Sequence, residues 1–151
     1  MFLNVYNLKN VTVYDYNSSP KTHPVGTNCL SNCVDLFKVD FLNSHQQSIC
    51  NDNSYQNCYK LEKFYVNGNA LSVANTLINI NINCFRNCYN LKYFDLSRAV
   101  STYTSGGVMR NAFENCFSLT QLALPSCIRS IDTYAFLNCY SLKDVFLNST
   151  V

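Results

Sequence analysis

The sequence predicts an α/β repeat solenoid that is rich in β-structure: a right-handed superhelix of about six coils with a short parallel β-sheet. The first observation behind this prediction is an asparagine that recurs every 23 to 30 residues, at Asn4, Asn32, Asn57, Asn87, Asn115 and Asn138. The second is the pattern Leu-x-x-apolar-x-apolar that follows each of them. Periods of this length are typical of solenoids, whose single repeats must stack to bury their apolar side chains. The right-handed winding is expected because parallel strands are almost always connected in that sense.

Each copy of the Leu-x-x-apolar-x-apolar pattern predicts a short strand whose alternate side chains point into the core. The repeat cores lie near 4–13, 32–41, 57–66, 87–96, 115–124 and 138–147. Stacked copies of such a strand form a parallel sheet, so residues 1–151 are expected to make a single domain.

A second side of each coil is predicted from a small residue followed by a bulky one, just before the asparagine. The pairs are Cys29-Leu30, Ser54-Tyr55, Cys84-Phe85, Ala112-Phe113 and Ala135-Phe136. They predict a helical turn or tight bend with the bulky side chain inside. A further inward residue is expected four places upstream, at Val25, Cys50, Ile80, Val108 and Ile131. The asparagines are expected to bond backbone groups at this bend and to stack as a ladder of amides, rather than to bind a ligand.

The best-preserved copies lie in residues 108–151, where Ala112-Phe113-Glu114-Asn115-Cys116 is matched by Ala135-Phe136-Leu137-Asn138-Cys139. Together with the leucines that follow, they resemble the BspA-like leucine-rich repeat family, whose unit reads I-x-x-A-F-x-x-C-x-x-L-x-x-I-x-L-P. The likeness is looser before residue 108 but extends over essentially the whole chain. It implies a leucine-rich-repeat scaffold for protein recognition, a kind often found in surface adhesion proteins.

The nine cysteines are best explained by packing. Five follow the repeated asparagine directly, and two occupy the small position before it, where a thiol serves as a small apolar side chain. Their odd number and regular recurrence argue against disulfides, and CxxxC pairs with His23 or His45 are a weak match to a structural zinc site. Cys127 lies outside both positions and is therefore the best candidate for an exposed, reactive thiol, although no neighbouring residue is an obvious cause of a lowered pKa.

No catalytic or cofactor site is expected, so the chain is predicted not to be an enzyme. The nine acidic residues show no close pairing, and Gly106-Gly107 is interpreted as a turn rather than a phosphate cradle. A Cys–His dyad stays an alternative, since sequence alone does not exclude it. The net charge of +2 without a basic run argues against nucleic-acid binding.

The apolar stretches are too short for a membrane span, and Met1-Phe2-Leu3-Asn4 does not resemble a signal peptide. Together with the many thiols, this predicts an intracellular location. The alternative is the cell surface, if the chain is a piece of a longer secreted array.

Protein partners are expected on the outward positions of the strands. Aromatic and charged side chains gather there in the middle coils, at Lys63, Tyr65, Lys92, Tyr93 and Asp95. Such a mixture on a rigid sheet is typical of protein-binding surfaces. The alternative is an ordinary solvated sheet, because tyrosine and threonine favour strands in any case.

The two ends of the array are a second predicted contact surface. Neither end of the sequence has a recognisable polar capping repeat, which solenoids normally need. The chain is therefore expected to be truncated, to associate end to end with itself, or to dock as a structural subunit in a larger intracellular complex.

Overall fold

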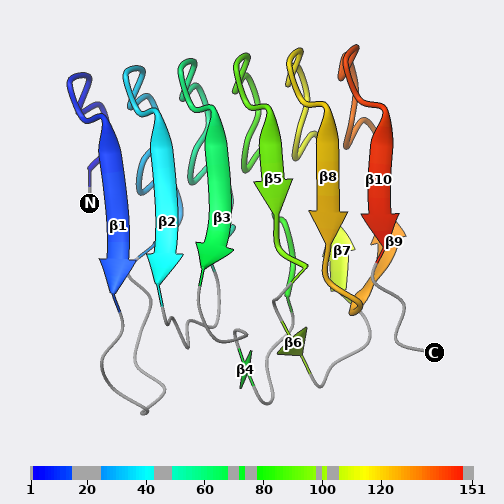
Figure 1. Cartoon of the computed structure of the whole chain (residues 1–151). Coiled ribbons are helices and arrows are strands. Elements are labelled where there is room, and N and C mark those ends of the chain that lie inside the picture. Colours follow the sequence, from blue (N-terminus) through cyan, green and yellow to red (C-terminus); the bar gives the residue numbers. More distant parts are fainter. Residues whose placement is uncertain are drawn as a thin grey trace.

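The computed structural model describes residues 2–14, 25–42, 49–67, 72–73, 78–97, 100–101 and 106–147. Six strands form one parallel sheet in the order β1 (Asn10–Tyr14), β2 (Lys38–Leu42), β3 (Lys63–Asn67), β5 (Tyr93–Asp95), β8 (Gln121–Leu124) and β10 (Asp144–Leu147). They lie side by side along the molecule (Figure 1). The predicted solenoid with a parallel sheet is thus confirmed.

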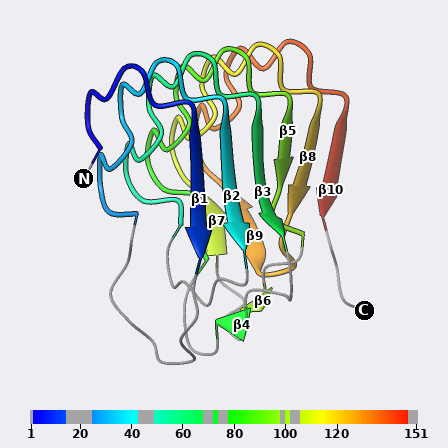
Figure 2. The same cartoon turned by 60° about the vertical axis from the view of Figure 1, so that its left-hand side comes forward.

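Four further strands of the described residues accompany the main sheet. β7 (Gly106–Val108) pairs in parallel with β9 (Ile128–Ile131), and β4 (Ser72–Val73) pairs in parallel with β6 (Val100–Ser101). Figure 2 shows the turns of successive repeats nested along one edge of the main sheet, with β7 and β9 behind that sheet.

The turns replace the helical part of the expected α/β class. None of the described residues forms a helix, and no described segment is therefore a candidate for a membrane-spanning helix. The reason lies in the backbone of the bends, where the repeated asparagines have positive φ angles of 60–64°. A right-handed helix does not continue through a residue in this left-handed conformation.

A second column of positive φ lies four residues before the first, with values of 54–58°. Its members are Asn28, Asn53, Asn83, Asn111 and Tyr134. Asparagine suits both columns because its short polar side chain tolerates this conformation better than most residues. Between the two columns, alternate backbone N–H groups donate to carbonyls of the next repeat, as from Asn53 to Ile82, from Tyr55 to Cys84 and from Asn57 to Arg86.

The repeated asparagines form the predicted ladder. Each side-chain Nδ2 donates to the Oδ1 of the asparagine in the preceding repeat, at 2.7–2.8 Å, from Asn138 through to Asn4. The expected partners were backbone groups, and this detail is wrong: the side-chain bonds of the ladder join amide to amide. One amide supplies both a donor and an acceptor, so a column of asparagines satisfies itself.

The strand register confirms the predicted inward and outward columns. Val39, Phe64, Phe94 and Leu122 align across four strands and are at most 2% exposed. The outward columns align as Asn10, Lys38, Lys63, Tyr93, Gln121, Asp144 and as Thr12, Asp40, Tyr65, Asp95, Ala123, Phe146.

Aromatic rings fill the core between the sheet and the turns. Tyr55, Phe85, Phe113 and Phe136 stack face to face along the turn side, with ring centroids 4.9–5.3 Å apart. Phe64 and Phe94 stack on the strand side and meet the first column edge to face. Offset stacks and T-shaped contacts are both favourable arrangements of aromatic rings. The bulky residue two places before the repeated asparagine therefore packs the turn against the sheet.

Two predicted features differ in the structure. Gly106 and Gly107 form part of β7 rather than a turn, and a Cβ at Gly106 would meet the carbonyl oxygen of Ile78. The backbone at Ile78 comes too close to Gly106 to leave room for a side chain, which explains the glycine at this position. Predicted inward residues Ile131, Val145 and Leu147 are 44–60% exposed, because they lie in the last described repeat and no described layer packs over them.

The assigned register predicts different costs for two neighbouring substitutions. Leu91 is fully buried, so Leu91→Ala is expected to lower the free energy of unfolding by about 2–5 kcal/mol through lost burial and a cavity. Lys92 is exposed, and Lys92→Ala should change it by no more than about 0.5 kcal/mol. Urea denaturation of both variants checks this, and similar midpoints would contradict the register.

Candidate functional site: the outer face of the sheet

The five predicted binding residues lie together on the solvent-facing side of β3 and β5. Lys63 is the register partner of Tyr93, and Tyr65 is the partner of Asp95. Lys92 directly precedes β5. Parallel strands place such partners about 4.8 Å apart, so the five side chains share one small area of the sheet. Tyr93 is 44% exposed.

Glu62 joins two of these residues and was missed in the sequence interpretation. Its carboxylate lies 3.5 Å from Nζ of Lys92 and 3.9 Å from Nζ of Lys63. The available signal was its place directly after Leu61, which matches the place of Lys92 after Leu91, together with its neighbour Lys63. Both lysine charges are therefore partly balanced within this face.

A second ion pair lies beside Tyr65. Nζ of Lys38 is 2.6 Å from the Asp40 carboxylate and 5.8 Å from the centre of the Tyr65 ring. The hydrogen bond to Asp40 raises the pKa of Lys38, so this side chain keeps its positive charge. The pair also explains how Asp40 is only 8% exposed on an outward position.

A shallow hollow of about 200 Å³ opens on the same face between β5, β8 and β10. It is lined by Tyr93, Phe94, Asp95, Gln121, Ala123 and Phe146. Ala123 is the small residue of its outward column, between Asp95 and Phe146. The hollow therefore lies over a position of β8 whose side chain is only a methyl group.

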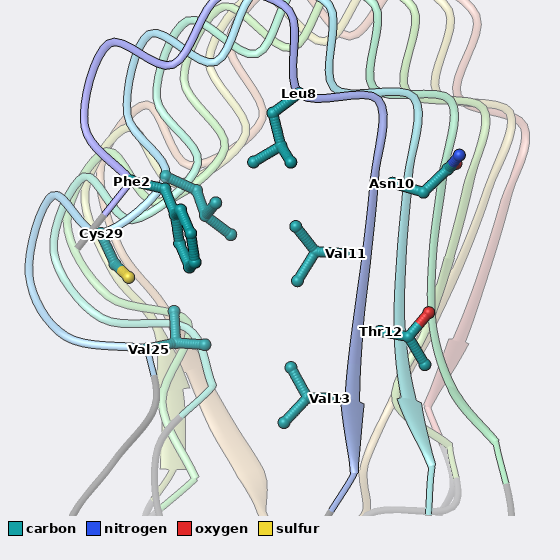
Figure 3. A pocket seen from close by; sticks show the side chains of 9 residues that line it. Phe2, Leu8, Asn10, Val11, Thr12, Val13, Val25 and Cys29 are labelled. Atoms are coloured by element: carbon teal, nitrogen blue, oxygen red, sulfur yellow. The ribbon is translucent and has the colours of Figure 1, made fainter.

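A larger hollow of about 440 Å³ lies at the β1 side of the stack. Figure 3 shows Leu8, Val11 and Val13 pointing into it from one side and Phe2, Val25 and Cys29 from the other, while Asn10 and Thr12 point away. The hollow is apolar because these are inward positions of the repeat. Among the described residues, no repeat lies beyond them.

A row of exposed rings runs along the turns and was also missed. Tyr59, Tyr89, Phe117 and Tyr140 stack with centroids 5.1–5.7 Å apart and planes within 9° of parallel. They are 37–78% exposed. The signal was an aromatic residue two places after the asparagine in most repeats. Because the ring faces are covered by the neighbouring rings of the stack, most of these rings expose only their edges to solvent.

Each of the five cysteines that directly follow a repeated asparagine donates its thiol to a backbone carbonyl of the preceding repeat. The Sγ–O distances are 3.0–3.2 Å, for example from Cys88 to Tyr55 and from Cys116 to Phe85. The same carbonyls accept an N–H within their own turn. The predicted packing role is therefore joined by a weak hydrogen bond.

The expectation that Cys127 is an exposed thiol is wrong. Its side chain is 2% exposed, and burial raises the pKa of its thiol. The carbonyl of Cys127 accepts the N–H of Gly106, which ties the turn before β9 against β7. This contact lies outside the repeated strand and turn, so the spacing of the motif gave no sign of it.

No group of three or more metal-ligating side chains gathers within the described ranges. His23 and His45, the histidines considered for zinc or a Cys–His dyad, lie outside those ranges.

The chain belongs to the BspA-type leucine-rich repeat family. The family model matches residues 1–73 and 64–151 with six copies. This agrees with the resemblance carried by the Ala-Phe and Asn-Cys positions.

Two solved structures have the same fold. One is a leucine-rich cell surface protein from Faecalibacterium prausnitzii, with 19% identity and a TM-score of 0.65 over 93% of this chain. The other is the leucine-rich repeat protein of T. pallidum, with 21% identity and a TM-score of 0.66 over 92% of this chain. This chain spans 32% of the first protein and 58% of the second. A search of curated proteins finds no match.

The cysteine environment predicts slow thiol labelling in the folded protein. Burial raises the pKa of Cys58, Cys88 and Cys116 well above its usual value and that of Cys139 to about 11, so little nucleophilic thiolate is present at pH 8. Iodoacetamide should label Cys139 first, because it is the least buried, and all nine cysteines once the chain is denatured without reductant. A chelator should leave the melting temperature unchanged.

Mass spectrometry of the labelled peptides gives the answer. Rapid native labelling of Cys127, or five or fewer labelled cysteines after denaturation, would contradict this account of the thiols.

Proposed function

We propose that this chain is a non-catalytic scaffold for protein recognition, of the adhesion type, wound as a right-handed superhelix of about six coils. The observation that carries the proposal is the gathering of Lys63, Tyr65, Lys92, Tyr93 and Asp95 on one face of the sheet. Membership of a repeat family with this use supports it, and so does the similar fold of a cell surface protein from F. prausnitzii.

The physical argument rests on rigidity and on exposed rings. The backbone of β3 under the site is paired with both neighbouring strands, β2 and β5. It is therefore already ordered before a partner binds, and binding does not carry the entropic cost of ordering it. Tyr93 offers a large exposed ring, and charged groups surround it. Tyrosine is among the residues that most often carry the binding energy of protein interfaces.

A second proposed role is that of a structural subunit joined through the ends of the stack, to another copy or within a larger complex. The 440 Å³ apolar hollow at the β1 side favours it, as do the exposed Val145 and Leu147 at the other side. Each apolar side chain covered by a partner contributes roughly 1.5–3 kcal/mol to association. The structural role goes with an intracellular location, because the buried thiols suit a reducing compartment, whereas the adhesion role goes with the cell surface, if the chain is a piece of a longer secreted protein.

Partner capture with matched variants tests these roles. The protein is immobilised, captured proteins from cells of its source are identified by mass spectrometry, and their affinities are then measured. Tyr65→Ser with Tyr93→Ser should weaken the main partner by at least about 30-fold, because central tyrosines at interfaces contribute about 2 kcal/mol or more. The control Tyr6→Ser with Tyr140→Ser makes the same changes on exposed rings of the turns and should leave the affinity within about threefold.

The outcomes separate the candidate surfaces. Loss of binding in the control pair alone would place the partner on the turns and contradict the proposed face. Capture of the chain itself, sensitive to Val11→Asp and unaffected by the tyrosine variants, would favour the structural role.

A further inference from the structure

The 200 Å³ hollow on the sheet face has the size of a site for one side chain. It lies above Ala123, with Asp95 on the strand to one side and Phe146 on the strand to the other. Two strand spacings of about 4.8 Å separate the backbones of β5 and β10, and alanine fills little of the space between them. Pockets for whole small-molecule ligands are typically about 300–1,000 Å³, so this one suits a smaller group.

The walls of the hollow combine rings with a carboxylate. Tyr93 is 44% exposed and Phe146 is 52% exposed. Asp95 accepts the backbone N–H of Ser97 at 2.8 Å through Oδ1. Within the described ranges no cation lies in ion-pair contact with Asp95, whereas Asp40 and Glu62 on the same face each have a lysine partner.

Gln121 adds a neutral acceptor. Its side chain lies on the strand between Tyr93 and Asp144 in the register, and it lines the hollow. Gln121 is exposed and lines the hollow, so its side-chain carbonyl oxygen can accept a hydrogen bond from a ligand. The hollow therefore presents acceptors and aromatic surface, and no cation from the described residues lines it.

We infer that this hollow receives the guanidinium of an arginine from a protein partner. This rests on the proposed recognition function and names the chemistry that the site selects. A guanidinium is flat, stacks on aromatic rings and offers five N–H donors, which match the Asp95 carboxylate and the Gln121 carbonyl together. A lysine ammonium has three donors around one point and uses fewer of these features, and an acidic side chain is repelled by Asp95.

The probe for the test is N-acetyl-arginine methylamide, added to the full chain carrying ¹³C-labelled alanine methyl groups. Ala123 forms the floor of the hollow and reports on binding, while the buried Ala112 and Ala135 serve as internal controls. We expect a saturable shift of the Ala123 signal alone. The neutral isostere N-acetyl-citrulline methylamide should bind about tenfold more weakly, because it loses the charge-assisted bonds to Asp95.

Variants then assign the contacts. Asp95→Asn should weaken the arginine probe about tenfold and remove its advantage over citrulline. Phe146→Leu, which keeps apolar bulk without the ring, should weaken it several-fold. The control Asp132→Asn removes the same charge from an exposed carboxylate outside the hollow and should have no more than about a twofold effect.

Three results would overturn the inference: equal binding of the arginine and citrulline probes, a lysine analogue that binds as tightly as arginine, or equal effects of Asp95→Asn and Asp132→Asn. A captured partner that is lost with the Tyr65/Tyr93 pair but unaffected by Asp95→Asn would also overturn it, while the proposed function stands. Probe binding at Ala123 without any captured partner would support the arginine site and count against the proposed function.

Discussion

The chain of asparagine amides from Asn4 to Asn138 is the interaction on which the rest of the structure depends. Each asparagine takes a left-handed backbone conformation, and the side chains of the inner four donate to one neighbouring repeat and accept from the other. The bend and the stacking are therefore enforced by the same residue. Once the bend is fixed, the bulky residue two places earlier faces the core, where its ring meets the rings of the strands. The thiol that follows the asparagine adds a further bond to the preceding repeat.

The outer face of the sheet inherits its geometry from this stack. Inward residues of neighbouring strands are aligned by the stacking of the repeats, so outward residues are aligned as well. The structure can therefore vary the outward columns without disturbing the core, and Ala123 between Asp95 and Phe146 is one such variation. A partner of such a solenoid contacts outward residues that are aligned across several neighbouring strands, rather than one isolated residue. Asp40 and Glu62 are paired with lysines on this face, whereas no described cation is in ion-pair contact with Asp95 beside the hollow.

The features that could be predicted from the sequence are those that recur in every repeat. The inward and outward columns were predictable because Leu-x-x-apolar-x-apolar fixes the strand register, and the ladder was predictable because asparagine recurs at one position. The second column of positive φ carried a signal in Asn28, Asn53, Asn83 and Asn111, but its meaning depends on backbone angles that composition does not give. Burial of Cys127 and the strand at Gly106 were beyond prediction, because they result from contacts between segments outside the motif. The hollow above Ala123 could not be predicted either, because the spacing of the repeats does not say how far each outward side chain is exposed.

The most direct test is the stability of variants at Asn87, in the middle of the ladder. Asn87→Gly keeps the φ of 64° accessible but removes the amide, and should lower the free energy of unfolding by about 1–3 kcal/mol because the amides of Asn57 and Asn115 lose a partner. Asn87→Ala should cost about 1 kcal/mol more, since alanine disfavours this conformation. Asn90→Ala, a nearby exposed asparagine outside the ladder, should stay within about 0.5 kcal/mol. Chemical denaturation in this order of stability would support the account, and an Asn87→Gly variant as stable as Asn90→Ala would contradict it.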